Sequence, residues 1–149
     1  MNQDYFDKIL AKAERGRTPQ MIELGHSYLK GYDYFGKDFE KNFEKSRYWL
    51  DLAHKKGAFT ATVLLGEIYE KGLGVDKDLD FSIELYNNAV ERGAFLPNLY
   101  LARIYSDEHN SKYDVKLAMY WYQKVISFES QVDDSESIKE AKEYIKQKK

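Results

Sequence analysis

The stretch Leu64–Val75 reads LLGEIYEKGLGV, and the glycine inside it decides the fold. Leu65, Ile68 and Tyr69 recur at the spacing of one helix face, which predicts an α-helix rather than a strand. Gly66 stands within that helix, where glycine is about 1 kcal/mol less favourable than alanine. We infer that Gly66 is there because another helix approaches it closely.

The same pattern occurs three times, and such internal repeats indicate a repeat architecture. The segment around Gly66 matches the next segment at a shift of 36 residues and the preceding one at a shift of 41. The additional residues of the earlier copy lie in the loop at residues 31–42. Each repeat contains two helical stretches with apolar positions in register. These recurring packing positions are Leu24, Gly25, Tyr28, Leu65, Gly66, Tyr69, Leu101, Ala102 and Tyr105 in the first stretches, and Ala53 and Ala89 in the second.

The third copy has Ala102 where the others have glycine, so the position requires a small side chain and not a positive φ. We expect the neighbouring aromatic side chains to fill the space beside the close contact, because aromatic residues bury large areas. This interpretation accounts for the 13 tyrosines of the chain.

Punctuating residues predict where the helices begin and end. Asn42, Asp78 and Asp114 precede the second helices and are N-cap residues, whose side chains accept bonds from free backbone N–H groups. Gly31 and Gly72 are predicted to end first helices.

Outside the repeats, the pattern predicts a leading helix at residues 4–15 and a capping helix at residues 134–147. Thr18 is predicted as an N-cap residue, with Pro19 at the first helical position.

The composition excludes several classes of protein. The chain has 149 residues, of which 43% are hydrophobic, so we expect a single domain with a core. It has no cysteine, which excludes disulfides and thiolate metal sites. No secretory signal and no long apolar run is found, so a cytoplasmic location and no membrane contact are expected. The net charge of −2 argues against a nucleic-acid binder.

At this point the residues are similar to a known family. Three copies of LGxxY or LAxxY in register, the GxGV loop of the second repeat and the matching second helices resemble the Sel1-like repeat, a relative of the tetratricopeptide repeat. The resemblance covers about residues 18–130. The first repeat lacks GxGV, and the third has DEHNSKY in its place.

The resemblance implies an all-α fold, a right-handed α-solenoid of about three antiparallel helix-pair repeats with the leading and capping helices at its ends. The repeats would span about residues 18–57, 58–93 and 94–130, in a single domain over 1–149. First helices would line the concave face, and such proteins generally bind other proteins.

Two sets of residues are candidates for protein binding. The concave positions that the resemblance carries over include His26, Lys30, Glu67, Glu70, Lys71, Arg103 and Asp107, which mix both charges as a specific partner requires. The alternative is an ordinary solvated face. The enlarged loop contributes the aromatic residues Tyr32, Tyr34, Phe35 and Phe39, because aromatic residues are favoured at interfaces. The alternative here is that the loop folds back to cover the first helix pair.

Other functions are not expected. His26, His54 and His109 lie in three different elements without metal-ligand spacing, so no enzyme, metal or cofactor is predicted. The equivalent positions His26, Glu67 and Arg103 do not agree, which argues against base-per-repeat RNA reading. Two protein-binding roles remain open: a cytoplasmic adaptor or scaffold, and a bacterial immunity protein that binds and neutralises a toxin.

Overall fold

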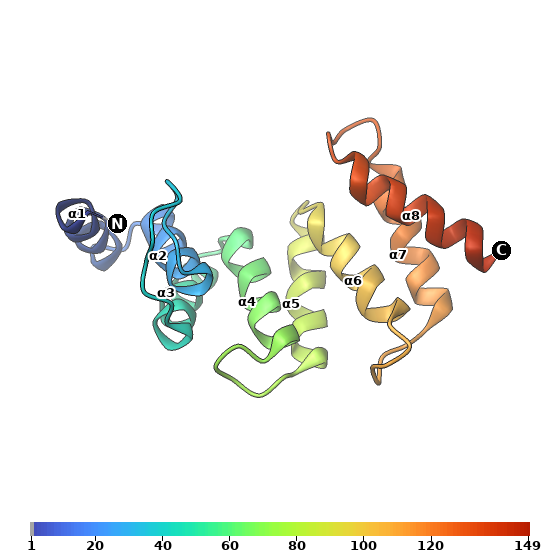
Figure 1. The fold of residues 1–149 in the computed structure, drawn as a ribbon, viewed down its shortest axis with the longest axis horizontal. Coiled ribbons are helices and arrows are strands. Elements are labelled where there is room, and N and C mark those ends of the chain that lie inside the picture. Colours follow the sequence, from blue (N-terminus) through green and yellow to red (C-terminus); the bar gives the residue numbers. More distant parts are fainter. Residues whose placement is uncertain (1) are drawn as a thin grey trace. The chain divides into compact units, whose positions relative to one another are not determined.

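The computed structural model describes residues 2–149, which form eight α-helices and no strand (Figure 1). The predicted all-α class is therefore confirmed. The helices are α1 (Gln3–Glu14), α2 (Thr18–Lys30), α3 (Phe43–Lys55), α4 (Phe59–Lys71), α5 (Leu79–Glu91), α6 (Leu96–Ser106), α7 (Val115–Ser127) and α8 (Ser135–Lys148).

Local caps explain the boundaries of these helices. The side chains of Asn42, Asp78 and Asp114 each accept a hydrogen bond from a backbone N–H in the first turn of the following helix. Gly31 and Gly72 end α2 and α4 in the left-handed conformation, with φ of 82° and 67°. Both sets of predictions are confirmed. Glycine suits these two helix ends because it adopts the left-handed conformation without a steric penalty.

The predicted cap at Thr18 is wrong by one residue. Arg17 is the N-cap of α2, and its carbonyl already accepts a hydrogen bond from the Met21 N–H at 3.2 Å. Thr18 is therefore the first helical residue. Pro19 fits the first turn because an N–H at that place has no intrahelical partner in any helix.

The contacts divide the chain into an N-terminal unit that ends at Leu85 and a C-terminal unit that begins at Tyr86, within α5. In the N-terminal unit α2 packs against α1 and α3, and α3 packs against α4 (Figure 1). In the C-terminal unit α7 packs against α6 and α8. The single-domain boundary stays a prediction.

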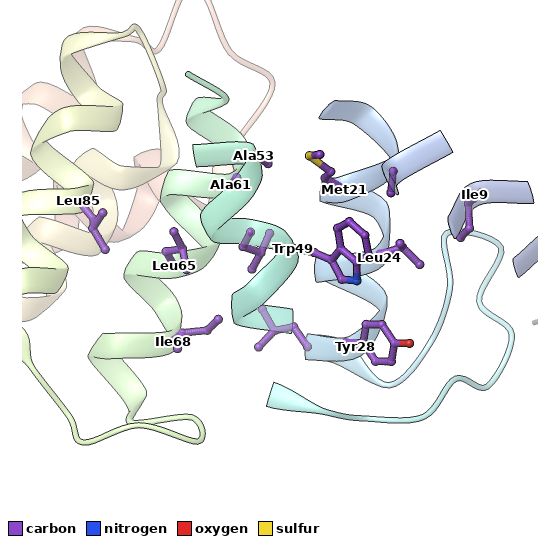
Figure 2. Packing of buried hydrophobic residues seen from close by; sticks show 13 residues of the cluster. Ile9, Met21, Leu24, Tyr28, Trp49, Ala53, Ala61, Leu65, Ile68 and Leu85 are labelled. Carbon is purple, nitrogen blue, oxygen red and sulfur yellow. The ribbon is translucent and has the colours of Figure 1, made fainter. Parts of the chain in front are cut away.

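The N-terminal unit has a continuous hydrophobic core along α1 to α4. Figure 2 shows Leu24 of α2, Trp49 of α3 and Leu65 of α4 among its residues; Leu24 is fully buried, and Leu65 is 2% exposed. The packing positions that the repeat marks in this unit are all buried or partly buried, and they are Leu24, Gly25, Tyr28, Ala53, Leu65, Gly66 and Tyr69.

A second core lies between α6, α7 and α8. Leu99 and Ala102 of α6 pack with Tyr122 and Val125 of α7 and with Ile138 of α8. The marked positions of this unit are also buried or partly buried, and they are Ala89, Leu101, Ala102 and Tyr105. Among the residues described, no helix is both long and apolar enough to cross a membrane.

Candidate protein-binding surface

The enlarged loop after α2 is an ordered hairpin. Asp33 is 2% exposed, and its Oδ1 accepts hydrogen bonds from the backbone N–H groups of Phe35 and Lys37, both at 2.9 Å. The Asp33 N–H donates to the Lys37 carbonyl, and Tyr32 pairs with Asp38 in an isolated antiparallel bridge. A single buried carboxylate thus fixes the turn.

The aromatic residues of the hairpin divide into two groups. Phe39 packs edge-on against Tyr28, with ring centroids 4.8 Å apart, and belongs to the periphery of the core. Tyr32, Tyr34 and Phe35 remain 46%, 52% and 69% exposed. The loop therefore covers the first helix pair with one aromatic side chain and presents three others to solvent.

His26 of α2 lies under the hairpin. Its ring meets Tyr32 and Tyr34 edge-on, at centroid distances of 5.9 and 5.2 Å. Burial and the positive charge of Lys30 lower the pKa of His26, so the imidazole is neutral at neutral pH. Its Nδ1 is buried and has no hydrogen-bond partner.

Lys30, Glu67 and Lys71 form an ionic triad between α2 and α4. Lys30 Nζ donates to both Glu67 oxygens, at 2.7 and 2.9 Å, and Lys71 Nζ donates to Oε1 at 2.9 Å. Burial alone would raise the pKa of Glu67, but the hydrogen bonds from the two lysines outweigh it and lower that pKa. Two cations share one carboxylate, so the triad carries a net positive charge.

We call the group formed by His26, Lys30, Tyr32, Tyr34, Phe35, Glu67 and Lys71 the α2–α4 surface. It contains seven of the ten residues that the sequence predicted for binding. Glu70 is on the same helix as Glu67 and is partly exposed.

Arg103 and Asp107 belong to the C-terminal unit. Arg103 makes a bidentate pair with Glu140 of α8, with Nε and Nη2 at 2.9 and 2.6 Å from the two carboxylate oxygens. Tyr122 OH donates to the same Glu140 at 3.0 Å. Asp107 follows α6 as its C-cap and accepts a hydrogen bond from the His109 N–H. Arg103 thus joins the last helix to α6.

The sequence reading missed the support that α1 gives to this surface. Tyr5 of α1 donates a hydrogen bond to Glu23, a carboxylate of α2 that is only 6% exposed. That bond, together with burial, raises the pKa of Tyr5 to about 12. The ring of Tyr5 also meets Phe35 edge-on at 5.5 Å. The sequence pattern gave no signal for this contact, because Glu23 lies outside the helix face that Leu24, Gly25 and Tyr28 mark as core.

The paired helices, the glycine and alanine contacts and the absence of strands among the described residues define a helical-repeat protein of the α-solenoid class, as the sequence predicted. The Sel1 repeat pattern matches residues 21–57, 60–93 and 98–125. The chain belongs to the Sel1 repeat family.

Solved structures agree with this assignment. The chain is similar to a Sel1 repeat protein from Oxalobacter formigenes, with a TM-score of 0.67 and 27% identity over 95% of this chain and 99% of that one. It is also similar in fold to a protective antigen of uropathogenic Escherichia coli that displays an SLR fold, with a TM-score of 0.69 and 24% identity over 81% of this chain. The match spans 25% of that antigen. No curated protein sequence matches the chain. Sel1 repeat proteins are generally protein-interaction modules.

Proposed function

We propose that this protein is a non-enzymatic interaction module, an adaptor or scaffold that holds a protein partner on the α2–α4 surface. The observation that carries the proposal is the exposure of Tyr32, Tyr34 and Phe35 on a hairpin whose conformation Asp33 fixes. Exposed aromatic side chains are enriched among residues that dominate binding energy. A loop that is already ordered loses little further entropy when a partner binds.

The ionic triad beside the hairpin supplies orientation. Lys30 and Lys71 leave a net positive charge next to the aromatic side chains, and Lys71 is 55% exposed at its side chain. Charges at such a position select partners and raise association rates more than they add affinity. We assign anchoring to the aromatic residues and discrimination between partners to the triad.

Glu70, Arg103 and Asp107 remain proposed binding positions on the concave face that the family resemblance implies. A cytoplasmic location is part of the proposal. The immunity role is its alternative, and a toxin identified as the bound partner would support it.

The test is affinity capture from the source cell, with the purified chain as bait and quantitative identification of bound proteins. Tyr34→Ser combined with Phe35→Ser should reduce capture of the specific partner by about tenfold or more, because hot-spot side chains are lost. Glu67→Arg should reduce it as well. Tyr48→Ser is the matched control, since Tyr48 is 58% exposed on α3 outside this surface.

Circular dichroism of each variant checks that the fold is retained. Partner capture that is unchanged by the hairpin variant and by Glu67→Arg, in folded protein, would contradict the proposed surface. If the hairpin variant and Glu67→Arg still capture the partner while Tyr48→Ser does not, the binding site lies on α3.

A further inference from the structure

Helix α7 presents an apolar stripe to solvent on the side opposite to its core contacts. Ala118, Tyr122 and Val125 are at most 3% exposed and face the core of the C-terminal unit. Leu117 and Tyr120, by contrast, are 40% and 48% exposed.

The charges around this stripe on α7 are all positive. The helix has the sequence VKLAMYWYQKVIS, with two lysines and no carboxylate. Lys116 and Lys124 are exposed, and Lys124 Nζ lies 5.6 Å from the centre of the Tyr120 ring. The nearest carboxylate along the chain, Asp114, is engaged at the N-cap by the N–H groups of Lys116 and Leu117.

We propose that this exposed face of α7 binds an acidic segment of a partner protein, in which apolar side chains contact Leu117 and Tyr120 and carboxylates meet Lys116 and Lys124. The stripe from Leu117 to Lys124 is about 10 Å long, the length of two helical turns. A short acidic segment with two or three apolar side chains is long enough to cover it. This face is separate from the α2–α4 surface and does not depend on the function proposed for that surface.

The small number of positive charges on α7 favours an acidic protein segment over a membrane surface or a nucleic acid. Each basic residue near an anionic membrane surface contributes only about 1 kcal/mol to binding, so the two lysines of α7 would hold it there weakly. A nucleic acid is bound through many phosphate contacts, and two lysines on a chain of net charge −2 provide few. Carboxylates interspersed with apolar side chains match both features of the stripe.

The repeat supplies a matched control on α3. Tyr48 and Trp49 form the same edge-on pair as Tyr120 and Trp121, with ring centroids 5.0 and 5.1 Å apart. Tyr48 is at the equivalent repeat position and is also exposed. Glu44 stands where α7 has Lys116, so the α3 face has the aromatic residue without the uniform positive charge.

The experiment is a selection of short random peptides displayed on phage, with the whole chain as bait and the Lys116→Glu, Lys124→Glu double variant as counter-bait. The enriched peptides should be acidic and contain apolar residues. In fluorescence anisotropy, their binding should weaken about tenfold in Leu117→Ser with Tyr120→Ser, which corresponds to about 1.4 kcal/mol. The affinity of these peptides for the unsubstituted chain should also fall at high salt, because salt screens the attraction between lysines and carboxylates.

Two comparisons make the outcome decisive. Tyr48→Ser and the hairpin variant Tyr34→Ser with Phe35→Ser should each change the affinity less than twofold, about 0.4 kcal/mol. Enriched peptides that are basic or uncharged, a selection without enrichment over the counter-bait, or equal loss in Tyr48→Ser would overturn the proposal. So would stronger α7-dependent binding of a uridine oligonucleotide, or of phosphatidylserine-containing vesicles, than of the acidic peptides.

Discussion

The first and the third helix pairs solve the same packing problem with different chemistry. In the first pair, Gly25 of α2 lies against Leu50 of α3, and a Cβ added at Gly25 would fall 2.6 Å from the Leu50 side chain. Ser46 Oγ donates a hydrogen bond to the Gly25 carbonyl at 2.7 Å. In the third pair, the equivalent positions are occupied by Ala102 and Ala118, and both are fully buried.

The difference shows which part of the repeat is fixed and which varies. Both pairs keep a small residue in the first helix, so the close approach of the backbones is retained. The second repeat follows the first, because Ser82 Oγ donates to the Gly66 carbonyl at 2.9 Å. In the third, the methyl side chain of Ala118 stands where the first has the hydroxymethyl group of Ser46, and Tyr122 occupies the position of Leu50. Small size is the requirement, and the hydrogen bond is an addition to it.

The largest expected loss of stability comes from a substitution that prevents the close contact between the two helices of a pair. Gly25→Leu should destabilise the fold by roughly 1–3 kcal/mol, because the new side chain overlaps Leu50 and the helices must separate. Gly66→Leu should have an effect in the same range. Urea unfolding followed by circular dichroism measures the change, with exposed Lys12→Leu on α1 as control. Neutral glycine variants would contradict the close-contact account.

A smaller loss of stability is expected when the first helix pair is given the alanine that the third pair has in place of Ser46. Ser46→Ala removes the hydrogen bond to the Gly25 carbonyl and should cost about 1 kcal/mol, since that bond is buried. Ser127→Ala is the control, because Ser127 Oγ makes the same kind of bond to the Lys124 carbonyl at an exposed position. If thermal melting finds Ser127→Ala as harmful as Ser46→Ala, burial of the hydroxyl is not the source of the stability.

Periodicity and capping residues were sufficient to predict the helices and their order. The start of α2 was misplaced because Thr18 and Pro19 suggest a cap, whereas backbone bonding begins at Arg17. The hydrogen bonds from Ser46 and Ser82 to the carbonyls of Gly25 and Gly66 were missed, although the two serines are at equivalent repeat positions. The repeat spacing shows which positions are equivalent, but it does not show which atoms form hydrogen bonds. Contacts between distant segments, such as Tyr5 with Glu23, depend on tertiary packing and had no local signal in the sequence.

The predicted site was recovered unevenly for the same reason. The hairpin aromatic residues were identified from their type, and the structure shows which of them remain exposed. The triad was predicted as separate charges, although Lys30 and Glu67 are bonded to each other. Arg103 was predicted as a binding residue, yet its guanidinium is engaged by Glu140, 37 positions along the chain. Side-chain pairing across that separation follows from the fold and cannot be deduced from spacing alone.

The smallest effect concerns two ion pairs that each join two helices, one in each unit. Lys30 pairs with Glu67 in one, and Arg103 pairs with Glu140 in the other. Hydrogen bonding by Arg103 lowers the pKa of Glu140 below its ordinary value of 4.5, in spite of partial burial. A carboxyl whose pKa is lowered on folding stabilises the protein above its unfolded-state pKa and loses that contribution as the pH falls through the folded-state value.

Glu140→Gln should therefore lower the stability at neutral pH by up to about 1 kcal/mol, a modest value because water screens this partly exposed pair. The difference from the unsubstituted protein should shrink as the pH falls below 4.5 and Glu140 becomes protonated. Thermal melting across this range measures both, with the exposed Glu143→Gln on α8 as control. A difference that stays constant with pH would mean that Glu140 contributes through packing and its bond with Tyr122, and not through the charge of the Arg103 pair.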